Sequence, residues 1–217
     1  MSITYYTEEE MREARNEAEA FRRISHDFSR IFARIVEPNV PQRRPDGTYC
    51  YIPHDYPSVL RCLNYAYKHL TKDGQYRSVK FIEAGSGLPL VSVLARSIGF
   101  SGITAVELSR DIVEHPITKI LLDEEISVKM VNDNILNIDY SGFDVVYYYR
   151  PFADEESEKK FEMLVEGSIK VGSIVIGAYK TFYNYENRND FKLLYENYDI
   201  KVIQKIKNVK KTKNKLS

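Results

Sequence analysis

One short run of residues, Phe81-Ile82-Glu83-Ala84-Gly85-Ser86-Gly87-Leu88-Pro89, constrains the fold of this chain most strongly. Four β-prone residues, 79–82, lead into an acid, two glycines follow one residue apart, and Pro89 opens a helical pattern, where its missing N–H costs nothing. The run predicts a strand, a glycine-rich turn and a helix. Such a turn lets a ligand approach backbone N–H groups at the positive end of a helix. It therefore indicates a site for a nucleotide-like cofactor.

Strand-like and helix-like segments alternate around this turn. Strands are expected at 79–83, 103–107, 127–131, 143–148, 171–179 and 199–206. Helices are expected from Asp55 or Ser58 to about Leu70, and at 88–98, 109–125 with a break at Pro116, 154–167 and 190–198. This alternation predicts right-handed crossovers and an α/β fold with a doubly wound, mostly parallel sheet.

A helical extension is expected before this unit. Thr7-Glu8-Glu9-Glu10 matches a capping box, apolar residues then recur every three or four positions as far as Ile35, and Pro38 ends the pattern. The chain thus divides into an N-terminal amphipathic helix with a Pro-rich loop (1–48), the α/β domain (49–206) and a Lys-rich tail (207–217). We expect the helix to pack on the domain or to mediate self-association.

Composition is that of a soluble chain. Of the 217 residues, 43% are hydrophobic and 29% are charged, with no apolar run of membrane-spanning length and no apolar signal core at the N-terminus. The two cysteines, Cys50 and Cys62, lack other metal-ligating residues nearby in the sequence. We therefore expect free thiols, no metal site, no membrane partner and a reducing, cytoplasmic compartment.

Charge is unevenly distributed along the chain. The net charge is zero, but residues 201–217 carry seven lysines and no acid, so the rest of the chain carries −7. A Lys-rich end is either a solvated tail or a contact for nucleic acid.

Acidic residues stand at the ends of three successive expected strands, at Glu83, Glu107 and Asp133. Dinucleotide-binding proteins carry G-x-G-x-x-G after the first strand, and here the third glycine is absent. An acid directly before the turn would also repel a pyrophosphate. It suits a ligand that carries an amino group and a sulfonium, which disfavours a nicotinamide-dependent oxidoreductase.

These features resemble the class I S-adenosylmethionine-dependent methyltransferases over roughly residues 50–206. Glu83-Ala84-Gly85-Ser86-Gly87 is similar to the family's acidic E/D-x-G-x-G motif, which wraps the methionine part of the cofactor. The resemblance implies a Rossmann-like methyltransferase fold with S-adenosylmethionine as cofactor. It implies that Glu107 holds the ribose hydroxyls and that Asp133 and Asn134 lie at the adenine. Tyr51 belongs to a Pro-containing segment that either covers the cofactor, with His54 and Tyr56, or is a packed loop.

In this family the loop after the fourth strand faces the methyl acceptor, which makes Tyr148, Tyr149 and Arg150 the candidate catalytic residues. The loop lacks Asp/Asn-Pro-Pro-Tyr and Pro-Cys, which argues against amino-methylating DNA enzymes and cytosine-C5 chemistry. Its aromatics could bind an amine, stack on a base or plug the strand end. Arg150 could pair with the substrate or with an acid such as Asp154.

The sequence leaves two hypotheses about function open. The first is a methyltransferase whose acceptor is a protein side chain or a nucleic acid, and the second is a non-catalytic binding or scaffold protein of the same fold. The family's sheet ends in an antiparallel hairpin, of which the sequence marks only 199–206. The seventh strand is therefore either poorly marked or absent.

Overall fold

The computed structural model of the protein describes residues 55–72, 78–122, 127–178, 189–197 and 200–208. The expected N-terminal helix, the Pro-rich loop, Cys50, Tyr51, His54 and the end of the Lys-rich tail lie outside these described residues.

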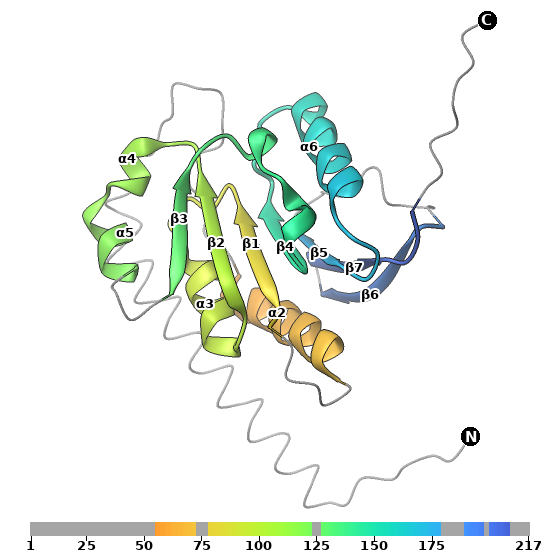
Figure 1. Cartoon of the computed structure of the whole chain (residues 1–217). Coiled ribbons are helices and arrows are strands. Elements are labelled where there is room, and N and C mark those ends of the chain that lie inside the picture. The colour runs from red at the N-terminus through yellow and green to blue at the C-terminus, as the bar shows by residue number, and fades with distance from the viewer. Residues whose placement is uncertain (1–54, 73–77, 123–126, 179–188, 198–199, 209–217) are drawn as a thin grey trace, which may run out of the picture.

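A seven-stranded sheet forms the centre of the described structure, in the order β3-β2-β1-β4-β5-β7-β6 (Figure 1). The strands are β1 (Lys80–Ala84), β2 (Ser101–Glu107), β3 (Val128–Asn132), β4 (Val145–Tyr149), β5 (Ile174–Ala178), β6 (Phe191–Asn197) and β7 (Ile200–Lys205). Strands β1 to β5 pair in parallel, whereas β7 is antiparallel to both β5 and β6. The predicted doubly wound, mostly parallel sheet is confirmed.

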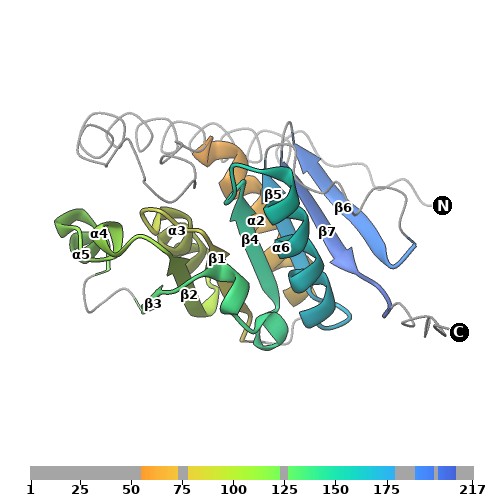
Figure 2. The same ribbon diagram turned by 90° about the horizontal axis from the view of Figure 1, so that it is seen from above.

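Helices cover both faces of this sheet (Figure 2). The α-helices are α2 (Tyr56–Thr71), α3 (Leu90–Ile98), α4 (Arg110–Val113), α5 (Pro116–Leu121) and α6 (Glu155–Ser168), and two short 3-10 turns are η2 (Ile135–Asn137) and η3 (Tyr140–Gly142). The break expected at Pro116 separates α4 from α5, because proline suits the first turn of a helix but not its interior.

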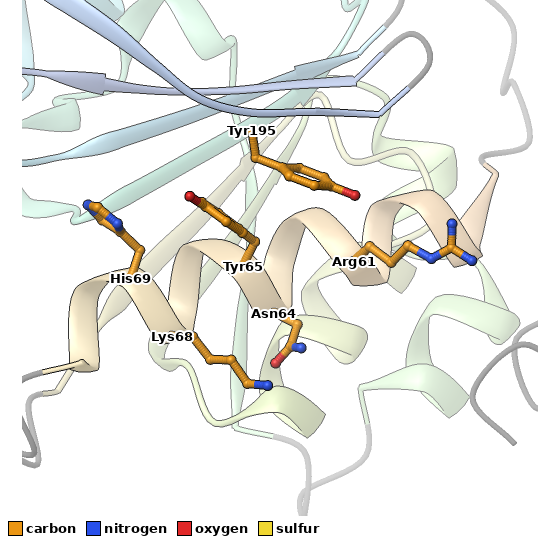
Figure 3. A pocket seen from close by; sticks show the side chains of 6 residues that line it. All are labelled: Arg61, Asn64, Tyr65, Lys68, His69 and Tyr195. Carbon is orange, nitrogen blue, oxygen red and sulfur yellow. The ribbon is translucent and has the colours of Figure 1, made fainter. Parts of the chain in front are cut away.

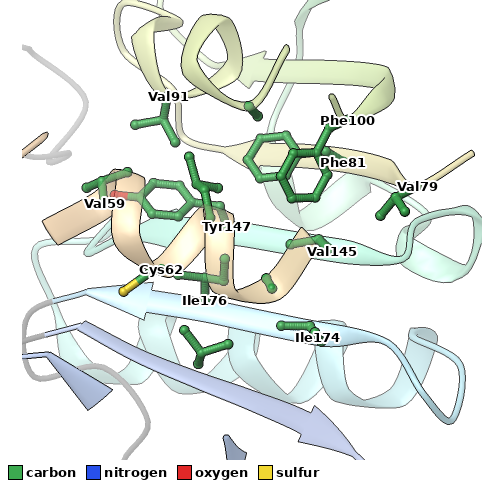
Figure 4. Packing of buried hydrophobic residues seen from close by; sticks show 14 of the residues in the cluster. Val59, Cys62, Val79, Phe81, Val91, Phe100, Val145, Tyr147, Ile174 and Ile176 are labelled. Carbon is green, nitrogen blue, oxygen red and sulfur yellow. The ribbon is translucent and has the colours of Figure 1, made fainter. Parts of the chain in front are cut away.

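Alternating residues along the central strands divide the core between the two faces. Phe81 and Tyr147 point toward α2 and α3, where they pack with residues that include Cys62 (Figure 4). Their chain neighbours Ile82 and Tyr148 point the other way and pack against α6. Because both faces are covered, the central strands β4 and β5 are continuous apolar runs rather than alternating ones.

The buried cysteine has a packing role on the α2 face. Cys62 is a free thiol with none of its surface exposed, and burial raises its pKa to about 12. The thiol therefore stays protonated at neutral pH, where it is a poor nucleophile. The expectation of a free thiol is confirmed for this residue.

The C-terminal hairpin differs from the sequence prediction. The prediction of a helix at 190–198 is wrong, because Phe191–Asn197 form β6. This is the edge strand that the sequence leaves in doubt. Leucine, lysine and glutamate favour helix locally, but backbone pairing with β7 and packing of Tyr195 against the α2 face decide the outcome. The hairpin that completes the family's sheet is thus present.

One lysine near the C-terminus is part of this architecture. The Lys205 side chain is 5% exposed, and its Nζ donates to the carbonyl oxygens of Glu166 and Ile169 at 2.8 and 2.9 Å. These carbonyls belong to the last turn of α6 and its C-cap, where a helix leaves its oxygens without partners and favours a cation. Lys205 therefore joins β7 to the end of α6.

We predict that Lys205→Met destabilises the protein by about 1.5–3 kcal/mol, because two buried carbonyls lose a charged donor. Urea denaturation monitored by circular dichroism measures this, with the exposed Lys207→Met as the matched control. Equal free energies of unfolding for the two variants would contradict the role of Lys205.

Candidate cofactor site at the carboxyl edge of the sheet

The glycine loop is fixed to the end of β2 by a set of backbone hydrogen bonds. The amides of Gly85 and Ser86 both donate to the Val106 carbonyl, at 3.0 and 2.9 Å. The Gly87 amide donates to Oε2 of Glu107 at 2.8 Å, and the Ser109 amide donates to Oε1 at 2.7 Å. The Glu107 carboxylate thus joins the end of β2 to the glycine loop that follows β1.

Gly85 permits a close approach of two loops. Its φ is +72°, in the left-handed region, and a Cβ built on it would lie 3.0 Å from Cβ of Pro151. A side chain at this position would therefore be strained and would also push Pro151 away. The loop that follows β4 lies directly against the glycine loop, so the predicted cofactor and acceptor regions are adjacent.

The acid of the motif faces the helix behind the loop. Glu83 is 1% exposed, and its Oε2 accepts hydrogen bonds from the amide and the hydroxyl of Ser92 on α3, at 2.8 and 2.6 Å. Burial raises the pKa of Glu83 to about 8, and the charge of Glu107 adds to this effect. Glu83 therefore ties β1 to α3 from inside the protein, a contact that the sequence motif alone does not show.

The end of β3 adds polar groups beside Glu107. The Asp133 amide donates to the Glu107 carbonyl at 3.2 Å, and Nδ2 of Asn132 donates to the carbonyls of Glu107 and Leu108. Asp133 Oδ1 accepts from the Asn134 amide at 2.6 Å, and the Asn134 side chain caps η2. Asn132 is a linking residue that the sequence analysis missed, although it stands in the same Asn-Asp-Asn run.

The candidate catalytic residues at the end of β4 separate into two environments. Tyr148 is fully buried, and its hydroxyl donates to Oε1 of Glu162 at 3.2 Å, beneath α6. Tyr149 and Arg150 are half-buried at the strand end, and Arg150 has a φ of +42°, which is uncommon for a residue with a side chain. The structure brings Tyr149 and Arg150, but not the Tyr148 hydroxyl, to the edge of the sheet.

A buried glutamate on α6 supports the same loop. Glu158 is 4% exposed and accepts from the Phe152 amide at 3.3 Å through Oε2, while Oε1 has no hydrogen-bond partner among the described residues. Burial raises its pKa to about 7, and the nearby Glu162 adds to the shift, whereas Arg150 opposes it. The signal in the sequence was two glutamates, four residues apart, on the apolar side of an amphipathic helix.

The structure therefore gathers most of the predicted cofactor residues at one edge, where the carboxyl ends of parallel strands meet. They are Gly85, Ser86, Gly87, Glu107, Asp133 and Asn134. Tyr56, one of the expected covering residues, packs with Leu88 and Leu90 just after the glycine loop. Among the described residues, no cluster of His, Cys, Asp or Glu could hold a metal ion, and no helix could cross a membrane.

Several solved structures with a similar fold are named as methyltransferases. The chain is similar to an RNA methyltransferase from Salinibacter ruber in complex with S-adenosyl-L-homocysteine (15% identity, TM-score 0.54, covering 74% of this chain and 97% of that one). It is also similar to a candidate RNA methyltransferase from Pyrococcus horikoshii (14%, 0.56, 78% and 95%) and a candidate methyltransferase from Escherichia coli (13%, 0.52, 67% and 87%). No family model and no curated protein matches the sequence. The chain has the Rossmann-like fold of class I methyltransferases.

We predict that Glu83 makes stability depend on pH. Between about pH 4.5 and 8 the folded state keeps a proton that the unfolded state has released, so the free energy of unfolding falls as pH rises through this window. Glu83→Gln keeps a carbonyl acceptor for Ser92 and cannot titrate. Denaturant titrations at pH 5, 6.5 and 8 should show wild type losing stability relative to Glu83→Gln, and parallel profiles would show that Glu83 does not titrate as described.

Proposed function

We propose that the protein transfers a methyl group from S-adenosylmethionine to an acceptor. The observation that carries the proposal is the Glu107 carboxylate bonded to Gly87 within a sheet of this strand order. The strand order supports the fold, and the contact places the acidic strand end beside the glycine loop where a cofactor's ribose and methionine parts would meet. The neighbouring structure solved with S-adenosyl-L-homocysteine supports the same choice of cofactor.

The residues at this edge suit that cofactor chemically. Backbone at Gly85 to Gly87 would follow its methionine part, and the Glu107 carboxylate would accept from two vicinal ribose hydroxyls in a charge-assisted contact. Asp133 and Asn134 would lie at the adenine, beside Glu107 on the neighbouring strand. The missing third glycine disfavours a dinucleotide, as the sequence predicts.

When bound, S-adenosylmethionine supplies a methyl group on a sulfonium, which an acceptor's lone pair takes as the carbon–sulfur bond breaks. The protein's part is to position the acceptor and to exclude water. In our proposal Tyr149 and Arg150 face the acceptor, because the β4 loop lies against the glycine loop through Pro151 and Gly85. Tyr148 instead fixes β4 to α6 through Glu162, and Glu158 holds the backbone of the loop at Phe152.

A non-catalytic member of the fold would bind the cofactor at the same residues without turnover. Cofactor binding therefore tests the site, and release of S-adenosylhomocysteine in the presence of acceptor tests the activity. Both hypotheses agree on the location of the cofactor site and differ only in chemistry.

We predict that the protein binds S-adenosylmethionine with micromolar affinity and does not bind NAD. Glu107→Gln should lower the affinity for S-adenosylmethionine by about 10- to 150-fold, which corresponds to the loss of one charge-assisted contact of about 1.5–3 kcal/mol. Isothermal titration calorimetry measures both ligands. The matched control is Glu114→Gln, an exposed acid on the C-terminal side of α4 that pairs with Arg110.

Binding of NAD without binding of S-adenosylmethionine would overturn the proposed function. Equal affinity in Glu107→Gln and Glu114→Gln would remove Glu107 from the cofactor site, even if the cofactor itself binds.

A further inference from the structure

A groove lies away from the glycine loop, between α2 and strand β6. Its volume is about 460 Å³, within the range of ligand-binding pockets. Six described residues line it: Arg61, Asn64, Tyr65, Lys68, His69 and Tyr195 (Figure 3). Five of them come from one helix and one from the edge strand that the sequence analysis took for a helix.

Helix α2 presents two different faces. Residues such as Val59, Cys62 and Ala66 are buried against the sheet. Arg61, Tyr65 and Lys68 recur at three- and four-residue steps on the adjoining face, and this spacing places them along one side of the helix. The residues that α2 contributes to the groove therefore form one continuous row along the helix.

The floor of the groove is aromatic. The rings of Tyr65 and Tyr195 stack with centroids 5.0 Å apart and planes inclined by 21°, and both rings are half-buried (Figure 3). The His69 ring lies nearly parallel to Tyr65 at 6.3 Å, and its Nε2 contacts Oε1 of Gln204 on β7. These contacts hold flat rings in fixed positions beside solvent.

The charges along the groove are of one sign. Arg61 and Lys68 are exposed and lie seven residues apart, about 10 Å along the helix axis. Among the described residues that line the groove none is acidic. The neighbouring acid Glu196 pairs with Lys201 at 3.7 Å. A negatively charged ligand with flat groups complements this surface.

The first residue of α2 packs beside the glycine loop. Tyr56, at the first position of α2, packs against Leu88 and Leu90, which follow the glycine loop directly. Along α2, the Arg61 end of the groove is therefore nearer to the glycine loop than the His69 end.

We propose that the groove between α2 and β6 binds single-stranded nucleic acid, with phosphates at Arg61 and Lys68 and a base stacked on Tyr195, the end ring of the His69–Tyr65–Tyr195 row. Aromatic platforms beside cations bind single strands with little dependence on sequence, because every base has a flat face and every nucleotide a negative charge. The binding surface stands independently of methyl transfer. Its extension, that the bound strand is the methyl acceptor, rests on the proposed function.

The test measures fluorescence anisotropy of a labelled 15-nucleotide single-stranded RNA with the full-length protein at several salt concentrations. Arg61→Ala/Lys68→Ala should weaken binding and reduce the salt slope by about 1.4, since each phosphate contact on a single strand contributes about 0.7. Tyr195→Ala should weaken binding by about 5- to 150-fold, and Tyr195→Phe should restore it. The matched control for charge is Lys119→Ala/Lys129→Ala, two exposed lysines near the opposite edge of the sheet.

Failure of wild type to bind the RNA at low salt would overturn the proposal, as would equal losses in the two double variants. Competition by polyglutamate that equals competition by RNA would indicate an acidic polypeptide as the ligand, and would overturn the proposal. Loss of RNA binding only when the lysines within 207–215 are replaced would place the contact in the tail, and would overturn it too. Because Arg61 and Lys68 are exposed, we expect their double variant to fold. It therefore tests the proposal even if Tyr195→Ala unfolds. The assay contains no S-adenosylmethionine, so RNA binding is measured independently of cofactor binding, which separates this proposal from the proposed function.

Discussion

The geometry of the site depends on the hydrogen bonds that the Glu107 carboxylate accepts from Gly87 and Ser109. They connect the end of β2 both to the glycine loop and to the start of α4. In a parallel sheet, neighbouring strand ends are held by the ladder only up to their last paired residues. Glu107 extends that connection into the loops, so the backbone that would surround a ligand is already shaped.

The residues around Glu107 hold the neighbouring loops in the same way. Glu83 lies inside the protein, behind the glycine loop, where its hydrogen bonds with Ser92 connect β1 to α3. On the other side of the loop, Pro151 occupies the space that a side chain at residue 85 would fill. The left-handed Arg150 and the buried Glu158 shape the β4 loop, so the proposed acceptor side of the site is built from constrained backbone. Fixed positions of this kind are what methyl transfer needs, because positioning supplies most of its catalysis.

Much of this arrangement could be predicted from the sequence. The strand–glycine–helix run, the acids at three strand ends and the continuous apolar strands have local signals, and the structure follows them. The strand at residues 190–198 was not predicted, because their composition favours helix, whereas pairing with β7, which in turn pairs with the distant strand β5, makes β6. Tyr148 was predicted to face the methyl acceptor at the end of the strand at 143–148, but its position on β4 turns the side chain toward α6. Lys205 stands in a run of lysines and differs from its neighbours only through its contacts with α6.

The most direct test of the account is a crystal structure of the protein with S-adenosylhomocysteine. The account predicts the amino acid part of this ligand along Gly85–Gly87, the ribose hydroxyls on the Glu107 carboxylate and the adenine beside Asp133 and Asn134. A ligand bound elsewhere, for example in the groove between α2 and β6, would contradict it. So would a fully occupied ligand at the glycine loop whose ribose does not contact Glu107.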